Sequence, residues 1–96
     1  PPDAILCIND ETAFGALHAA HEHGLEIGRE LAIAGFDGVQ ASGHTEPPLT
    51  TLDIPLGELA SQLAHMLLAK INGEALATEE IIIRPTLLVR ASTGGK

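Results

Sequence analysis

Three polar side chains follow two apolar runs of this sequence and could bind a small polar molecule. Asn9 and Asp10 come directly after the apolar run 4–8. Asp37 follows a second apolar run, 31–36. A carboxylate can accept hydrogen bonds from two adjacent hydroxyls, and an amide both donates and accepts, so these groups suit a sugar or another polyol. Asn and Asp are also frequent at turns and helix starts, which makes a purely structural role the alternative.

The pattern around these residues predicts a βαβ unit. Apolar runs that end in polar residues are typical of short strands buried on both faces of a parallel sheet. Between the two runs, apolar residues recur at helical spacing; Asp10 or Thr12 can cap this helix, and Gly24 can end it in a left-handed conformation. Parallel strands joined in this way have their carboxyl ends at one edge. Asn9 and Asp37 are therefore expected at the same edge of an α/β fold.

The rest of the chain predicts a loop, an extended segment, a second helix and two β-rich pieces. Residues 38–48 are rich in turn-forming residues, and LTTLD follows at 49–53. The segment 56–71 has one apolar face at helical spacing, with Pro55 suited to its first turn and Gly73 to its end. Residues 79–93 contain two β-rich pieces separated by Pro85, which lacks the amide hydrogen of a strand ladder.

Composition and charge exclude several classes of function. The 96 residues, 45% of them hydrophobic, suffice for one small domain with a single core. Thirteen acidic residues against five basic ones give a net charge of -8, which repels phosphate backbones, so we expect no DNA binding by these residues. The chain has no apolar run as long as a membrane span and no export signal at its N-terminus. The lone Cys7, within an apolar run, predicts a buried thiol and a reducing, cytoplasmic setting.

The sequence carries no recognisable catalytic motif. His18 and Glu22 share a helix face at i and i+4, as metal ligands can, but His21 falls on another side, and a solvated helix end explains these residues better. The serines lack the flanking glycines of a nucleophile elbow. We therefore expect neither an enzyme nor a metal or other cofactor.

Four separated segments resemble, in order, the C-terminal part of the LacI/GalR-type transcriptional regulators. They read DAILCINDETAFGAL, LAIAGFDG, PPLTTLDIPLGELASQLAHMLLAKINGE and RPTLLVRAST. The resemblance implies a fold like the type I periplasmic binding proteins, in which two α/β subdomains enclose a ligand cleft. It also implies that residues 1–96 are the C-terminal portion of a sensor domain, whose N-terminal part and helix-turn-helix headpiece lie outside this chain.

The resemblance assigns roles to several residues. In the family, the Asn of ND and the Asp of GFD touch the effector, which implies ligand binding by Asn9 and Asp37 and leaves helix capping to Asp10. The family dimerises through the helix after ND and the loop after GFD. The matching positions are Phe14, Leu17 and His18 in the helix, with Val39 to Pro47 in the loop; Phe14 could equally belong to the core.

The implied function is the effector-binding and dimerising portion of a transcriptional regulator. A small ligand, such as a sugar, would alter DNA binding by the headpiece through linkage between the two sites. The last helix of the family packs on the other subdomain, so the apolar face of 56–71 is expected to be uncovered here and to drive self-association. The alternative is a sugar-binding component of a transporter, which shares the fold; a helix-turn-helix or an export signal upstream would distinguish the two.

Overall fold

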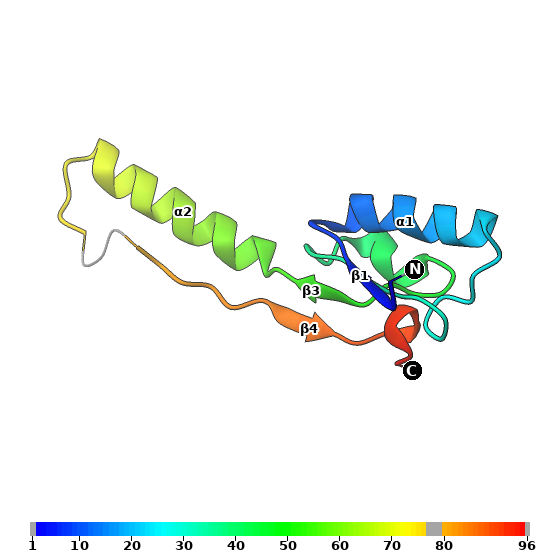
Figure 1. The fold of residues 1–96 in the computed structure, drawn as a ribbon. Coiled ribbons are helices and arrows are strands. Elements are labelled where there is room, and N and C mark those ends of the chain that lie inside the picture. Colours follow the sequence, from blue (N-terminus) through cyan, green and yellow to red (C-terminus); the bar gives the residue numbers. More distant parts are fainter. Residues whose placement is uncertain (1, 77–79, 96) are drawn as a thin grey trace. The chain divides into compact units, whose positions relative to one another are not determined.

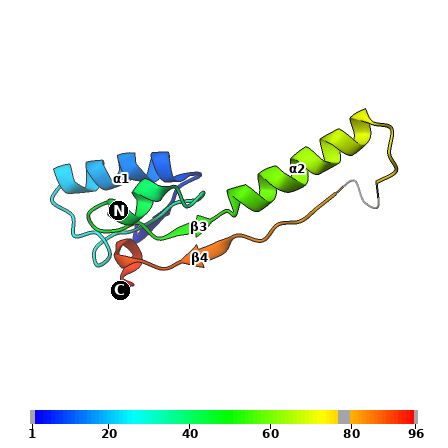
Figure 2. The same ribbon diagram turned by 180° about the vertical axis from the view of Figure 1, so that it is seen from behind.

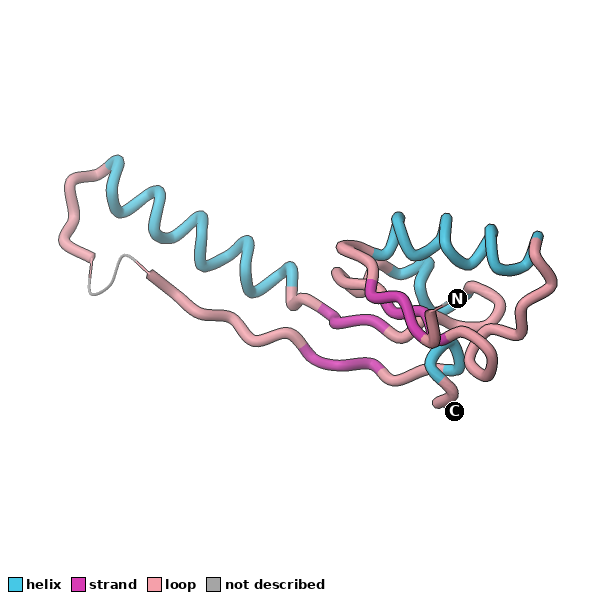
Figure 3. The backbone as a smooth tube through the Cα atoms, viewed as in Figure 1, coloured by secondary structure: helices cyan, strands magenta, loops and turns pink. Residues whose placement is uncertain are grey.

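The chain forms four short strands, two α-helices and two 3₁₀ helices in the computed structural model, which describes residues 2–76 and 80–95 (Figures 1 and 3). It divides into two compact units, where composition predicts one. The first unit holds the residues up to Asp53 and from Thr86 onward, and the second is Ile54–Pro85. The elements in chain order are β1 (Ala4–Leu6), α1 (Asp10–Glu22), β2 (Ala32–Ala34), the 3₁₀ helix Gln40–His44, β3 (Thr51–Asp53), α2 (Leu56–Ile71), β4 (Thr86–Leu88) and the 3₁₀ helix Ala91–Thr93.

The predicted βαβ unit is confirmed. β1 and β2 are parallel, with Ala4 opposite Ala32 and Leu6 opposite Ala34. Main-chain hydrogen bonds continue the pairing beyond the strands, from Cys7 N to Ala34 O and from Asp10 N to Phe36 O, both 2.9 Å. Figures 1 and 2, which view the chain from opposite sides, show α1 lying along this strand pair.

The prediction that the first strand is buried on both faces is wrong within this chain. Ile5 and Cys7 point toward α1 and contact the core, whereas Leu6 is 79% exposed and Ile8 is 82% exposed. Neighbouring side chains of a strand alternate between faces, and no described residue covers the second face of β1. The core lies on the α1 side, and its buried apolar residues are Cys7, Ala13, Leu17, Ala20, Leu31, Ile33 and Leu49.

Asn9, and not Asp10 or Thr12, caps α1. Its side-chain Oδ1 accepts a hydrogen bond of 2.8 Å from Thr12 N, which satisfies one of the free amides of the first turn. The predicted end of the helix at Gly24 is confirmed. Gly24 has a φ of 66°, and Leu25 N donates to Ala20 O at 3.0 Å, the pattern of a Schellman motif.

β3 pairs with β4 along its whole length. The pairing is antiparallel, with Thr51 opposite Leu88 and Asp53 opposite Thr86. Two isolated parallel bridges lie next to this pair. One joins Ala34, the last residue of β2, to Thr50, and the other joins Asp37 to Asp53, the last residue of β3. Of the two β-rich pieces expected in 79–93, only 86–88 is a strand; residues 80–85 are irregular, and Glu79 lies outside the described residues.

The second unit consists mainly of α2, which has the predicted bounds and ends in a second Schellman motif at Gly73, with Glu74 N donating to Ala69 O at 2.9 Å. α2 buries none of its residues within the chain. Its large exposed apolar side chains are Leu56, Leu63, Leu67, Leu68 and Ile71. Among the described residues, no helix combines the length and apolarity that crossing a membrane requires.

Candidate ligand-binding edge

The parallel pairing brings Asn9 and Asp37 to one edge of the strands, as predicted. The hydrogen bond from Asp10 N to Phe36 O, 2.9 Å long, joins the residue after Asn9 to the residue before Asp37. Both side chains are half-buried in the chain. Asn9 Oδ1 accepts the capping bond, and the Nδ2 group is the donor that this side chain can offer to a ligand.

Asp37 has an unusual backbone. Its φ of 122° makes it the one described non-glycine residue with a positive φ, a region that L-residues rarely adopt. Its amide donates to Leu52 O at 3.0 Å, and Gly38, with a φ of 73°, follows. Such conformations persist where the surroundings impose them, and they are frequent at binding sites.

Asp10 lies inside the fold, and the prediction that it caps α1 is wrong. The residue is fully buried, its Oδ1 accepts from Thr51 Oγ1 at 2.6 Å, and its Oδ2 accepts from Val39 N at 2.9 Å. The carboxylate therefore links the start of α1 to β3 and to the loop after β2. Sequence reasoning missed Thr51 altogether, because nothing in the local pattern LTTLD indicates a partner in α1.

Two glycines of the GFDG segment permit these close approaches. A Cβ on Gly35 would collide with Asp10 Oδ1 and would lie 3.1 Å from Leu49 Cδ2. A Cβ on Gly38 would lie 2.5 Å from Asp53 Cα. Any larger residue at either position would push the Asp10 side chain or β3 away.

A largely buried polar network fastens the C-terminal RAST segment to β2, to the segment before β3 and to the loop 38–48. Ser92 Oγ donates to Ile33 O at 2.6 Å and accepts from Thr50 N at 2.8 Å. Arg90 Nη1 donates to Ser42 Oγ at 2.8 Å, and Ser42 Oγ donates to Val39 O at 2.6 Å. Every buried side-chain nitrogen and oxygen of the described residues has a partner, so this network holds the loop 38–48 in place.

The helix positions predicted for a dimer interface line a shallow groove of about 290 Å³ together with Thr45 and Glu46 of the predicted loop, whereas Val39 and Pro47 do not line it. Leu17 is only 5% exposed and belongs to the core, and Phe14 packs against that core. His18 is exposed, Val39 is 37% exposed and Pro47 is half-buried. The residues that line the groove are Phe14, Leu17, His18, His21, Thr45 and Glu46. Helix and loop thus share one surface, and the interface stays a prediction.

The histidines of α1 make local contacts. His18 Nε2 lies 2.8 Å from Glu22 Oε1, on the exposed side of the helix. His21 Nε2 donates to Glu46 O at 2.6 Å and ties the helix to the loop, while His23 Nδ1 donates to Ala19 O at 2.9 Å. In the part of the chain that the structure describes, no three His, Cys, Asp or Glu side chains are grouped to hold a metal ion.

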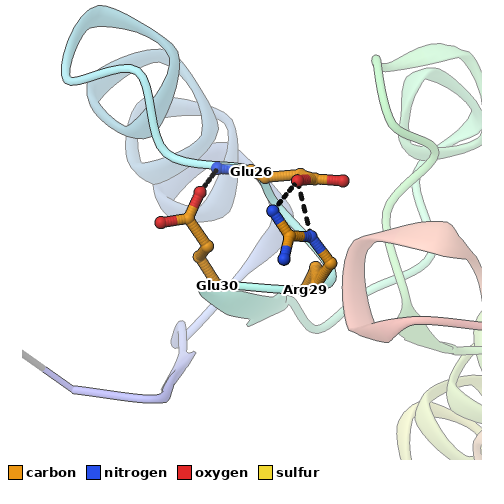
Figure 4. Close-up of polar contacts among 3 residues, drawn as sticks. All are labelled: Glu26, Arg29 and Glu30. Carbon is orange, nitrogen blue, oxygen red and sulfur yellow. Dashed lines mark hydrogen bonds and ion pairs between the residues drawn. The ribbon is translucent and has the colours of Figure 1, made fainter.

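Two regions of the first unit have shifted pKa values. Burial raises the pKa of the Cys7 thiol. In the loop after α1, a hydrogen bond from Arg29 lowers the pKa of the Glu26 carboxyl, and the Arg29 charge acts in the same direction. Figure 4 shows Arg29 reaching Glu26 Oε2 with two nitrogens, while Glu30 accepts from Glu26 N at 3.0 Å. This cluster is exposed and lies apart from the edge that carries Asn9 and Asp37.

The chain matches, over residues 1–93, the family described as periplasmic binding protein-like domain. The chain belongs to this family. The domain is 37% identical over 89 residues to an uncharacterized HTH-type transcriptional regulator in the aml 5′ region of Streptomyces limosus, covering 93% of this chain and 25% of that protein. It thus spans about a quarter of that relative's length.

Solved structures agree with this assignment. A regulatory protein of the LacI family from Chloroflexus aggregans is 39% identical, with a TM-score of 0.84 over 97% of this chain and 33% of that one. The lac repressor dimer bound to operator and the anti-inducer ONPF is 32% identical, with a TM-score of 0.87 over 96% of this domain and 28% of the repressor chain. The predicted fold class and the resemblance to LacI/GalR-type regulators are confirmed. These relatives are described as regulators or repressors and not as enzymes.

Proposed function

We propose that this domain is the C-terminal portion of the sensor domain of a LacI/GalR-type transcriptional regulator, and that Asn9 and Asp37 bind its small-molecule effector. The observation that carries the proposal is the pairing of β1 with β2, which puts the two side chains at one strand edge. Ligands of open α/β sheets bind beyond the carboxyl ends of the strands, which is where both residues lie. The proposed effector is a sugar, because a carboxylate and an amide together recognise patterns of hydroxyls.

The proposed effector acts on DNA binding at a distance. The lac repressor structure described above contains both an operator and an anti-inducer, which supports a regulator with separate DNA and effector sites. With a net charge of -8, these 96 residues are unsuited to grip DNA, so the proposal places DNA binding in a helix-turn-helix headpiece outside this chain and the regulator in the cytoplasm. A transport component is not favoured, because the relatives are regulators.

Calorimetric titration of the full-length regulator tests the effector site. A thermal-shift screen against sugars and nucleosides first identifies the ligand, since a molecule that binds only the folded state raises the melting temperature. We expect Asp37→Ala to weaken binding about ten- to a hundredfold, the usual effect of losing a charged hydrogen-bond partner. Asn9→Asp retains the capping oxygen and removes the amide donor, and we expect it to weaken binding less.

Asp3→Ala is the matched control, because it removes the same charge from an exposed residue before β1, at the opposite end of the strand. If Asp37→Ala binds the effector as tightly as the unmodified regulator, the edge is only a turn and the proposed site is wrong.

The proposal includes a homodimer formed through α1 and the loop 38–48. The groove beside Phe14 and His18 supports it, since helix and loop residues contribute to one surface. His18→Glu should raise the dimer dissociation constant by placing a charge in this groove. Ala19→Glu, which adds the same charge on the solvent side of α1, is the control. Sedimentation velocity measures both, and an unchanged dimer in His18→Glu would rule out this surface.

A further inference from the structure

Hydrogen bonds hold the backbone on both sides of Asp37. Before it, Phe36 O accepts from Asp10 N at 2.9 Å. After it, Gly38 N donates to Thr51 Oγ1 at 3.3 Å and Val39 N donates to Asp10 Oδ2 at 2.9 Å. Residue 37 thus has its φ of 122° between two segments that are both tied to Asp10.

Asp10 and Thr51 form one buried unit, which we call the Asp10–Thr51 clamp. Thr51 Oγ1 donates to Asp10 Oδ1 at 2.6 Å while it accepts from Gly38 N. Asp10 is fully buried and Thr51 is 1% exposed, so neither side chain has water as an alternative partner. Burying a carboxylate is costly unless its oxygens are hydrogen-bonded, and here each oxygen faces a donor.

The clamp is specific for a carboxylate at position 10. A carboxylate only accepts, whereas an amide of the same shape replaces one acceptor by two donors. In Asp10→Asn, the new NH₂ group would face either the Val39 amide or the Thr51 hydroxyl. In the first case two donors meet; in the second, the Thr51 hydroxyl hydrogen loses its acceptor. The first orientation loses the bond that holds Val39 N, and the second leaves the Thr51 hydroxyl hydrogen buried without an acceptor, so the clamp is weakened in both cases.

We propose that Asp10, together with Thr51, is a positioning residue for Asp37: the Asp10–Thr51 clamp imposes the left-handed backbone of residue 37 and so fixes where its carboxylate stands at the strand edge. The role of Asp37 in binding a ligand rests on the proposed function. The effect of the clamp on the backbone of residue 37 can be tested without any ligand.

A double-mutant cycle in the full-length regulator tests the clamp. Glycine adopts a positive φ without strain, so Asp37→Gly relieves the strain that the clamp imposes. When Asp10→Asn has weakened the clamp, residue 37 relaxes and the glycine relieves less strain. The change in melting temperature caused by Asp37→Gly should therefore be more favourable in the unmodified protein than in Asp10→Asn, by at least about 2 °C. The chain-entropy effect of glycine is the same in both backgrounds and cancels in the comparison.

Three further variants separate positioning from general destabilisation. Ser92→Ala removes two buried hydrogen bonds, to Ile33 O and from Thr50 N, that do not involve residues 36–39, so Asp37→Gly should have its unmodified effect in that background. Thr51→Ser keeps the hydroxyl and should retain the coupling, whereas Thr51→Val, which leaves only the bond from Val39 N to Asp10 Oδ2, should reduce it. Equal effects of Asp37→Gly in the unmodified and Asp10→Asn proteins, or undiminished coupling in Thr51→Val, would overturn the proposal. Failure of Asp37→Ala to weaken effector binding would instead overturn the proposed function and leave this result standing.

Discussion

Ser92 Oγ donates a hydrogen bond of 2.6 Å to the main-chain oxygen of Ile33, 59 positions earlier in the chain. Both residues are fully buried, and the same hydroxyl accepts from Thr50 N at 2.8 Å. One side chain thus satisfies groups of β2 and of the segment entering β3. The C-terminal RAST segment is in this way part of the core of the first unit, although it lies outside the βαβ order.

Ser92→Ala should destabilise the protein by about 1–3 kcal/mol, because it leaves Ile33 O and Thr50 N buried without a partner. Urea unfolding measures the change. Ser61→Ala, on the exposed surface of α2, should change stability by less than about 0.5 kcal/mol. Similar effects of the two substitutions would show that the buried network adds no stability.

Gly35→Ala and Gly15→Ala should act in opposite directions. A Cβ at residue 35 meets Asp10 Oδ1 and Leu49, so we expect a loss of about 1–3 kcal/mol from overpacking. A Cβ at residue 15 meets nothing within 4 Å and lies inside α1, where alanine is the better helix former, so we expect a gain of about 0.5–1 kcal/mol. Thermal unfolding of both variants checks the signs, and a stabilised Gly35→Ala would contradict the close packing of Asp10.

The Glu26–Arg29 contact should affect the titration of Glu26 much more than the stability of the fold. The hydrogen bond from Arg29 lowers the pKa of the Glu26 carboxyl in the folded state. Any stabilisation is therefore present above the unfolded-state pKa and is lost as the pH falls through the folded-state pKa. Arg29→Ala should raise the Glu26 pKa toward its ordinary value, which an NMR titration can follow. The melting temperature should stay the same, because both side chains are mostly exposed; a clear drop would show that this exposed pair matters for the fold.

Cys7 should react slowly with iodoacetamide in the folded protein. Its side chain lies in the core, and burial raises the pKa of its thiol, so little thiolate is present near neutral pH. Labelling measured by mass should become fast once the protein is unfolded in urea. Rapid labelling under native conditions would show that the β1 side of the core opens readily.

The sequence predicted the elements that depend on local patterns. The helix ends at Gly24 and Gly73 follow from residue types a few positions apart, and the parallel pairing of β1 with β2 follows from the order of strand, helix and strand. The roles of Asn9 and Asp10 could not be separated in this way, because both residue types make good caps. What decides them is Thr51, which lies 41 positions beyond Asp10 and draws its carboxylate into the core.

Burial was predicted less well than secondary structure, because it too depends on residues that lie far apart in the sequence. The run 4–8 has the composition of a strand covered on both faces, yet Leu6 and Ile8 are exposed within this chain. Apolar composition shows that a surface favours burial but does not say which part of a polypeptide covers it. Ser92 illustrates the converse, since a serine near the C-terminus gives no local sign that it will be fully buried.

The pairing of Asp53 with Thr86 has a consequence for engineering. These residues are the last before and the first after the unit Ile54–Pro85, and they sit opposite each other on adjacent antiparallel strands. The thirty-odd residues between them can therefore be removed as one segment, because the two residues that flank it are only a strand spacing apart, about 5 Å. A two-residue Asn-Gly turn can bridge such a gap. Joining Asp53 to Thr86 in this way should give a hairpin-closed minidomain, with α2 removed and every buried residue of the first unit retained.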